Sequence, residues 1–223
     1  MNLLRSLLFY LAFYSGTFVL LLIAPFQRRA GMRRVAGAWS GLHRWCVRHI
    51  LRIRVIHEGA PIDGPALYAM RHESFFEAID APCVFGWPVI FAKRELLELP
   101  VWGNAAATYG IIPVARDEGA KALRGLMRAA RDAKDEGRPF LIFPEGTRTP
   151  HGEEAPIVSG FAGLYKLLDL PVVPVAVNSG PLYRGFVKQT GQITYRFGEA
   201  IAPGLDRKEV ERQVREAINA LNA

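Results

Sequence analysis

The first 57 residues contain no aspartate and no glutamate, whereas they contain nine arginines. The whole chain of 223 residues has a formal net charge of +7, so the remainder carries 7 − 9 = −2 and is close to neutral. The positive charge therefore belongs to the N-terminal segment and not to the body of the protein. A nucleic-acid-binding protein normally carries its basic patch on the folded domain beside a recognition motif. No such arrangement is present, so we do not expect nucleic acid as a partner.

Cysteine is also scarce, since the chain has only Cys46 and Cys83. Two cysteines are consistent with a reducing compartment. Cysteine and histidine are nowhere spaced as in a zinc site, so we expect neither a metal ion nor a cofactor. Cys83 has no basic residue beside it that would lower the pKa of its thiol, which argues against a thiol nucleophile.

A long uncharged run occupies the N-terminus. Residues 7–24 contain no charged side chain, and 18 residues are the lower limit of what spans a bilayer core. The run is followed by Arg28, Arg29, Arg33 and Arg34. Because an arginine excess after a span marks the cytoplasmic side, we expect the protein at the cytoplasmic face of a membrane, specifically a bacterial inner membrane.

The next segment is suited to the membrane surface. Residues 35–51 mix Trp39, Trp45 and aliphatic residues with histidine and arginine, which favours a helix at the headgroup level in contact with anionic lipid. We therefore interpret residues 1–55 as membrane-anchoring helices. The alternative is a cleaved signal peptide, but the small residues 36–38 lie beyond the arginine cluster and the apolar run is long.

Residues 56–223 alternate short apolar runs with helical patterns, which predicts an α/β domain with a largely parallel sheet flanked by helices. Helices are expected over residues 117–136 and from Asp206 onward, where Asp206 and Glu209 form a capping pattern. Pro113 and Pro174 fall inside two predicted strands and indicate edges, bulges or shorter strands there. The predicted strands cover residues 66–70, 88–92, 110–114, 139–143, 172–177 and 192–197.

His72 and Glu77 are the first catalytic candidates. They follow the apolar run 66–70, and a histidine held by a carboxylate accepts a proton from a hydroxyl near neutral pH. Neither a helix nor a strand brings residues five apart together. A strand ending near Met70 and a helix beginning near Ser74 would let His72 fold back toward the first helical turn, at a corner where open sheets often carry active sites.

The same residues have a structural interpretation. Ser74 and Glu77 fit a capping box, in which the serine caps a helix and the glutamate accepts a hydrogen bond from the N–H of the cap residue. On this motif alone, the catalytic pair and the helix cap stay equal alternatives.

A second motif follows the buried-looking run 139–143. Proline and glycine in Pro-Glu-Gly-Thr-Arg, residues 144–148, force a turn at the end of a strand. The turn directs Glu145, Thr147 and Arg148 outward, and the planar fork of arginine suits a phosphate or a carboxylate. More basic residues follow other strand ends, at Lys93, Arg94 and Arg116.

Together these motifs resemble the glycerolipid acyltransferase family, in particular the lysophosphatidic acid (1-acylglycerol-3-phosphate) acyltransferases. The resemblance covers residues 66–180, and one departure stands out, since the family pattern is His-x4-Asp and this chain has Glu77. The motifs that carry it are His-x4-acid at 72–77, Lys-Arg-Glu-Leu at 93–96, Gly-x-Ile-Pro-Val-x-Arg at 110–116, Phe-Pro-Glu-Gly-Thr-Arg at 143–148 and Val-Pro-Val-Ala at 173–176.

The resemblance implies that acyl-CoA or acyl-carrier protein donates a fatty acyl group to lysophosphatidic acid, giving phosphatidic acid for phospholipid synthesis. His72 would be the general base and Glu77 its orienting acid, without a covalent intermediate. The phosphate and polar part of the acceptor would contact Lys93, Arg94, Arg116, Glu145, Gly146, Thr147 and Arg148.

Three alternatives stay open at this point. The acceptor could be another lyso-lipid, such as lyso-ornithine lipid, because Glu77 replaces the usual aspartate. The chain could also be a non-catalytic membrane lipid-binding protein, which would release no thiol from acyl-CoA. A thioesterase would release thiol without any acceptor.

Overall fold

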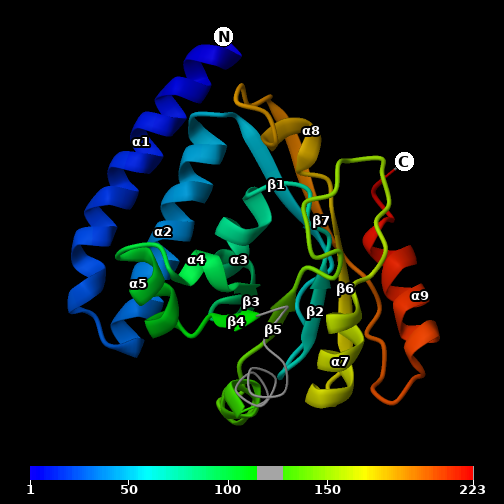
Figure 1. Ribbon diagram of the computed structural model, residues 1–223. Helices are drawn as coiled ribbons and strands as arrows, with labels where there is room; N and C mark the ends of the chain where they lie inside the picture. The colour runs from blue at the N-terminus through cyan, green and yellow to red at the C-terminus, as the bar shows by residue number, and fades with distance from the viewer. Residues whose placement is uncertain (115–127, 223) are drawn as a thin grey trace.

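A computed structural model describes residues 1–114 and 128–222 of the chain and shows a seven-stranded sheet with helices on both faces (Figure 1). The strands lie in the order β1-β7-β6-β2-β5-β3-β4. Five of the six neighbouring pairs are parallel, and only β6 and β7 pair antiparallel. This confirms the predicted α/β class. The strands are β1 (Ile53–Glu58), β2 (Leu67–Met70), β3 (Val89–Lys93), β4 (Ile112–Val114), β5 (Phe140–Ile142), β6 (Val172–Val177) and β7 (Gly191–Phe197).

All six predicted strands occur, with ends within two residues of the prediction. β1 was not predicted because Arg54, His57 and Glu58 interrupt its apolar residues at the end of the basic segment. β1 crosses the expected boundary at residue 56 and pairs with β7 over its whole length. The sheet therefore begins before that boundary.

The two strand prolines have different positions. Pro113 lies in β4, a three-residue strand at the edge of the sheet, as predicted. Pro174 lies in β6, an interior strand, so it marks no edge. The antiparallel pairing shifts by one residue between Val175 with Phe197 and the bridge of Val172 with Ile201, so the expected bulge is present at Pro174. Its carbonyl accepts from Gly198 on the β7 side, and the β7 ladder starts only at Val175. The missing N–H therefore falls where the ladder ends.

The described helices are α1 (Asn2–Ile23), η1 (Ala24–Phe26), α2 (Arg29–His49), α3 (Phe76–Phe85), α4 (Arg94–Leu97), α5 (Trp102–Tyr109), α7 (Ser159–Leu168), α8 (Gly180–Tyr183) and α9 (Arg207–Ile218). The predicted C-terminal helix is confirmed, since the Asp206 side chain accepts from the N–H groups of Lys208 and Glu209. Residues 128–135 of the predicted helix 117–136 are helical and end before Gly137 at φ +68°, while its start lies outside the described residues.

Alternate residues of β2 enter two different cores. Leu67 and Ala69 pack with α7 and α9, whereas Tyr68 and Met70 pack with α1, α2 and α3. Phe9 of α1 is only 1% exposed and belongs to the second core. The N-terminal helices therefore contribute buried side chains to the core of the α/β domain.

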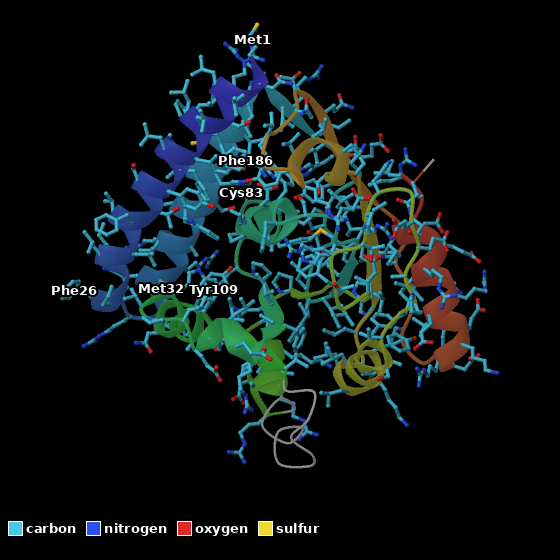
Figure 2. All side chains as sticks on the ribbon, turned by 45° about the horizontal axis from the view of Figure 1, so that its top comes forward. Met1, Phe26, Met32, Cys83, Tyr109 and Phe186 are labelled. Atoms are coloured by element: carbon cyan, nitrogen blue, oxygen red, sulfur yellow. The ribbon has the colours of Figure 1, made fainter. Side chains whose placement is uncertain are left out.

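The other side of α1 is apolar and exposed. By length and composition, residues 2–26 could cross a membrane, since they contain an 18-residue window with a mean hydropathy of 2.2. Figure 2 shows Met1 and Phe26 at the two ends of this side, whose side chains project away from the body. We call it the apolar side of α1; it consists of Leu3, Leu4, Leu7, Leu8, Leu11, Tyr14, Phe18, Val19, Leu22 and Ile23. An exposed apolar surface of this length fits contact with lipid.

Candidate active site

Three loops meet at one edge of the sheet. β2 lies between β5 and β6 and is parallel to both, so their carboxyl ends are adjacent. Residues 71–75 follow β2, residues 143–149 follow β5, and residues 178–180 follow β6. The sharp passage from β2 to α3 is the strand-to-helix corner that the sequence predicted.

Buried hydrogen bonds hold the His72 backbone in this corner. Its N–H donates to the Glu145 carboxylate at 3.0 Å, and its carbonyl accepts from the N–H of Thr149 at 2.8 Å. The other oxygen of Glu145 accepts from Arg71 at 2.6 Å. Glu145 is only 4% exposed, and burial raises the pKa of its carboxyl. The buried Glu145 carboxylate therefore fixes the backbone of the loop that carries His72.

The His72 ring stacks on Phe143, with ring centroids 4.0 Å apart. Its Nδ1 is buried without a hydrogen-bond partner among residues 1–114 and 128–222. Burial lowers the pKa of the imidazole to about 3, and the positive charge of Arg148 lowers it further. The ring is therefore neutral at pH 7, which is the form that accepts a proton.

Glu77 does not hydrogen-bond to this ring in the described structure. Its carboxylate accepts from the backbone N–H of Glu73 at 2.8 Å and of Ser74 at 3.2 Å. It also accepts from the hydroxyls of Ser74 at 3.0 Å and Ser179 at 2.8 Å. The Ser74 hydroxyl in turn accepts from the N–H of Phe76. Ser74 and Glu77 thus make hydrogen bonds of the helix-cap interpretation, although the cap residue of α3 is Phe75 and not Ser74. Burial raises the pKa of Glu77 to about 7.

Arg148 is an exposed residue whose positive charge acts on the His72 ring. Its guanidinium lies over the ring of Phe75 at 4.0 Å. Thr147 is also exposed, and Gly146 makes the turn at φ +67°. The predicted turn after β5 is therefore present, with its threonine and arginine open to solvent, whereas the prediction that Glu145 points outward is wrong, because its carboxylate is buried against Arg71 and the His72 N–H.

Of the other predicted basic residues, the structure describes the side chain of Arg94. Arg94 begins α4, directly after β3, which is parallel to β5. Arg116 and the side chain of Lys93 lie outside the described part of the structure. Their assignment to the acceptor stays a prediction.

Sequence reasoning missed a second histidine–acid pair. Nδ1 of His151 lies 2.9 Å from the Glu73 carboxylate, whose other oxygen accepts from the N–H of Gly180 at 2.7 Å. Glu73 is fully buried, and the guanidinium of Arg71 lies 3.6 Å away. No spacing rule connects residues 73 and 151, because the pair forms only when the loops after β2 and β5 meet.

The described residues contain no group of three histidine, cysteine, aspartate or glutamate side chains placed to hold a metal ion. The chemistry available at this edge is that of a neutral imidazole, buried carboxylates and exposed guanidinium groups. Such a set can move a proton from a hydroxyl and bind an anion.

The chain is similar to known proteins over most of its length. Residues 52–178 match the family described as Acyltransferase. The 1-acyl-sn-glycerol-3-phosphate acyltransferase of Pseudomonas aeruginosa is 33% identical over 208 residues, which cover 88% of this chain and 80% of that protein. The Helicobacter pylori protein of the same name is 33% identical over 122 residues, which cover 52% of this chain and 50% of that protein.

A solved structure has the same fold. The crystal structure of the 1-acyl-sn-glycerophosphate (LPA) acyltransferase PlsC from Thermotoga maritima matches with a TM-score of 0.75 at 21% identity, covering 98% of this chain and 95% of that chain. The family match spans 178 − 52 + 1 = 127 of the 223 residues and includes the corner after β2 and the turn after β5. The chain therefore belongs to the acyltransferase family and is an enzyme of that family.

Proposed function

We propose that this protein transfers a fatty acyl group from a thioester donor, acyl-CoA or acyl-carrier protein, to the free hydroxyl of lysophosphatidic acid, which gives phosphatidic acid. The observation that carries the proposal is the neutral His72 imidazole next to the exposed cation of Arg148. The imidazole can accept a proton from a hydroxyl and the guanidinium can bind a phosphate, and lysophosphatidic acid has both groups. The names of the Pseudomonas and Helicobacter relatives support the same acceptor.

The reaction needs no covalent enzyme intermediate. The His72 ring accepts the proton of the acceptor hydroxyl while the hydroxyl oxygen bonds to the thioester carbonyl carbon. The resulting tetrahedral oxyanion collapses, the carbon–sulfur bond breaks, and the thiolate leaves with the proton of the imidazolium. Glu77 acts by holding the corner that carries His72 through its hydrogen bond with Ser74.

Acceptor binding also tunes the base. The charge of Arg148 lowers the pKa of His72 in the free enzyme. Burial is the larger cause of the lowered pKa of His72, and a phosphate bound to Arg148 removes the second cause, so the pKa of His72 rises when the acceptor is present. Arg94 and the predicted Lys93 and Arg116 would complete the phosphate site.

The membrane position follows from the apolar side of α1. Both substrates are amphiphiles that partition into a bilayer, and a helix that lies against lipid keeps the enzyme where they are. The arginine excess after α1 favours the cytoplasmic face.

An acceptor panel tests the function. Purified full-length protein receives acyl-CoA with lysophosphatidic acid, with lyso-ornithine lipid or with no acceptor, and product mass and free thiol are measured. Phosphatidic acid with equal release of thiol is the expected result. If only acylated ornithine lipid forms, the acceptor is lyso-ornithine lipid and not lysophosphatidic acid. Release of free thiol without any acceptor would indicate a thioesterase. Lipid binding without thiol release would overturn an enzymatic role. A parallel series with acyl-carrier protein identifies the donor.

A further inference from the structure

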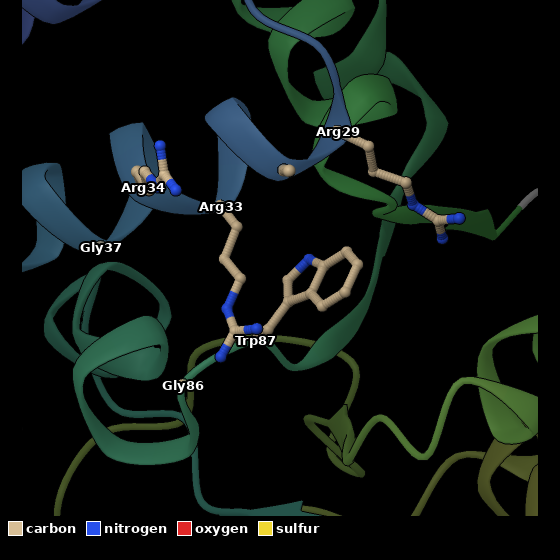
Figure 3. Close-up of a pocket in the computed structure, with 7 residues that line it drawn as sticks. Arg29, Arg33, Arg34, Gly37, Gly86 and Trp87 are labelled. Atoms are coloured by element: carbon tan, nitrogen blue, oxygen red, sulfur yellow. The ribbon is translucent and has the colours of Figure 1, made fainter.

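A basic hollow lies away from the catalytic corner. It has a volume of about 590 Å³, which is in the range of small-molecule sites. Its lining comes from the start of α2 and the turn after α3 (Figure 3): Arg29, Ala30, Arg33, Arg34, Gly37, Gly86 and Trp87. α3 begins at the catalytic corner and ends at this turn, and ten helical residues span about 15 Å. We call this feature the arginine hollow.

The arginine hollow has more cations than its neighbours neutralise. Glu136 pairs with Arg29 and lies 3.7 Å from Arg138. Arg33 and Arg34 are exposed and form no ion pair with any residue in 1–114 or 128–222. Burial lowers the pKa of Arg138 to about 10, with a further contribution from the charge of Arg29. Clustered like charges repel, so an anion in this place would relieve the repulsion.

Trp87 organises these cations. Three guanidinium carbons lie near its ring centroid, that of Arg138 at 4.1 Å, that of Arg29 at 5.4 Å and that of Arg33 at 5.5 Å. The indole N–H donates to the carbonyl of Tyr109 at 3.1 Å, which fixes the ring. Figure 3 shows Arg33 reaching from α2 to Trp87. Guanidinium groups held in advance by an aromatic ring lose less freedom when they bind an anion.

Two glycines keep the arginine hollow open. A Cβ added at Gly37 or Gly86 would meet no atom within 4 Å. Gly86 ends α3 at φ +74°, so its backbone explains its identity. Gly37 lies inside α2, where glycine is a poor helix former and where no close contact requires it. The absence of a side chain there leaves space that a ligand can occupy.

The arginine hollow is next to the lipid-facing surface. α2 begins three residues after Phe26, which is 86% exposed and continues the apolar side of α1 through Leu22 and Ile23. When that side lies in the acyl-chain region of a bilayer, arginines that follow it directly in the chain reach the level of the lipid phosphates.

We propose that the arginine hollow binds the phosphate of an anionic phospholipid in the membrane, with Arg33 and Arg34 as its ligands and Trp87 as its wall. The proposal concerns a site separate from acyl transfer and does not depend on which lyso-lipid is acylated. It predicts a preference for anionic membranes beyond what the general charge of the N-terminal segment provides.

Vesicle flotation tests this with full-length protein. Vesicles are made of phosphatidylcholine, with or without one fifth phosphatidylglycerol, and the ratio of the two partition coefficients is measured. Replacing both Arg33→Gln and Arg34→Gln should lower this ratio roughly 10- to 30-fold. The matched control is Arg48→Gln with Arg54→Gln, which removes the same charge from exposed positions of the same basic segment. It should lower the ratio by less than about threefold.

A second variant separates shape from charge. Gly37→Leu fills the arginine hollow without changing the charge, and it should lower the ratio while binding to phosphatidylcholine vesicles persists. The proposal would be overturned if the two double arginine variants lowered the ratio of partition coefficients equally. It would also be overturned if Gly37→Leu kept the full preference for anionic vesicles. Either result would indicate general electrostatic attraction of the basic segment. Binding of adenosine 3′,5′-bisphosphate that disappears in Arg33→Gln/Arg34→Gln, with an unchanged lipid ratio, would assign the site to the nucleotide of coenzyme A instead. Circular dichroism of each variant verifies folding.

Discussion

Ser179 donates a hydrogen bond of 2.8 Å to the carboxylate of Glu77, the acid that the sequence pairs with His72. Ser179 is fully buried and also lies 2.7 Å from the hydroxyl of Ser74. The acid at the start of α3 is therefore held by the loop after β6, about a hundred residues further along the chain. The geometry of the catalytic corner depends on both loops.

We expect Ser179→Ala to lower both stability and turnover. A hydrogen bond to a carboxylate contributes about 2 kcal/mol, and its loss leaves Glu77 less firmly placed. Because the Ser179 hydrogen bond lowers the pKa of Glu77, the variant should also shift the acid limb of the turnover profile to higher pH. Ser40→Ala is the matched control, since Ser40 in α2 is equally buried and its hydroxyl accepts a hydrogen bond from the backbone N–H of Cys83 in α3. A turnover loss of the same size in Ser40→Ala would reduce the role of Ser179 to stability alone.

His72→Ala should reduce turnover by about 10² to 10⁴ without unfolding the protein, because general-base catalysis contributes that range. His49→Ala, which changes an exposed histidine at the end of α2, should leave turnover unchanged. The measurement is thiol release with saturating acceptor. Near-normal activity in His72→Ala would remove the imidazole from the mechanism.

Glu77 should give the protein a stability that falls as the pH rises. Burial raises its pKa in the folded state to about 7, against 4.5 as the ordinary value. Between these pH values the folded state holds the proton and the unfolded state has lost it, so the free energy of unfolding declines, by up to about 3 kcal/mol. Glu77→Gln should remove this decline, as measured by urea unfolding at pH 4.5, 6 and 7.5.

Variants of Glu77 also discriminate between a role in catalysis and a role as a helix cap. His72 contributes the opposite slope, because its pKa is lowered and its stabilising effect is lost as the pH falls. Subtracting the curve of Glu77→Gln from that of the unmodified protein isolates the glutamate. Turnover should drop severely in Glu77→Ala and mildly in Glu77→Asp. A change in melting temperature with no change in turnover would leave only the helix cap.

Arg148→Gln should raise the KM for lysophosphatidic acid about 10- to 100-fold, the equivalent of one charge-assisted hydrogen-bonded contact. It should also move the acid limb of kcat/KM to higher pH, because Arg148 lowers the pKa of His72. Arg131→Gln, at an exposed position of the helix before β5, is the control. An unchanged KM would move the phosphate site to the other basic residues.

The sequence predicted the elements of this fold better than their contacts. Strand ends and the C-terminal cap depend on local patterns, which is why β6 and Asp206 were correct. The partner of Glu77 was missed because Ser179 becomes its neighbour only when β6 lies beside β2. Glu145 looked like a surface residue on a turn, yet Arg71 and the His72 N–H draw it inward. β1 was not recognised because Arg54, His57 and Glu58 interrupt its apolar residues and leave no continuous apolar run.

Arg71 connects the catalytic corner to the C-terminal end of the chain. Its side chain is fully buried and binds Glu145, the carbonyls of Pro150 and Glu153, and the Asn219 side chain at 2.7 Å. Removing the cation leaves a buried carboxylate without its partner, which costs about 3 to 5 kcal/mol.

Arg71→Met should therefore lower the free energy of unfolding by about that amount, and the double variant Arg71→Met/Glu145→Gln should recover part of it because Glu145 then no longer leaves an unpaired charge, while Glu73 keeps His151. Asn219→Ala removes only one neutral partner and should cost about 1 kcal/mol. Urea unfolding at pH 7 measures all three. Simple addition of the Arg71 and Glu145 effects would mean that the two side chains are independent, contrary to the 2.6 Å contact between them. Coupling above about 1 kcal/mol would show that the carboxylate under His72 is held in place by an arginine that the catalytic step itself never touches.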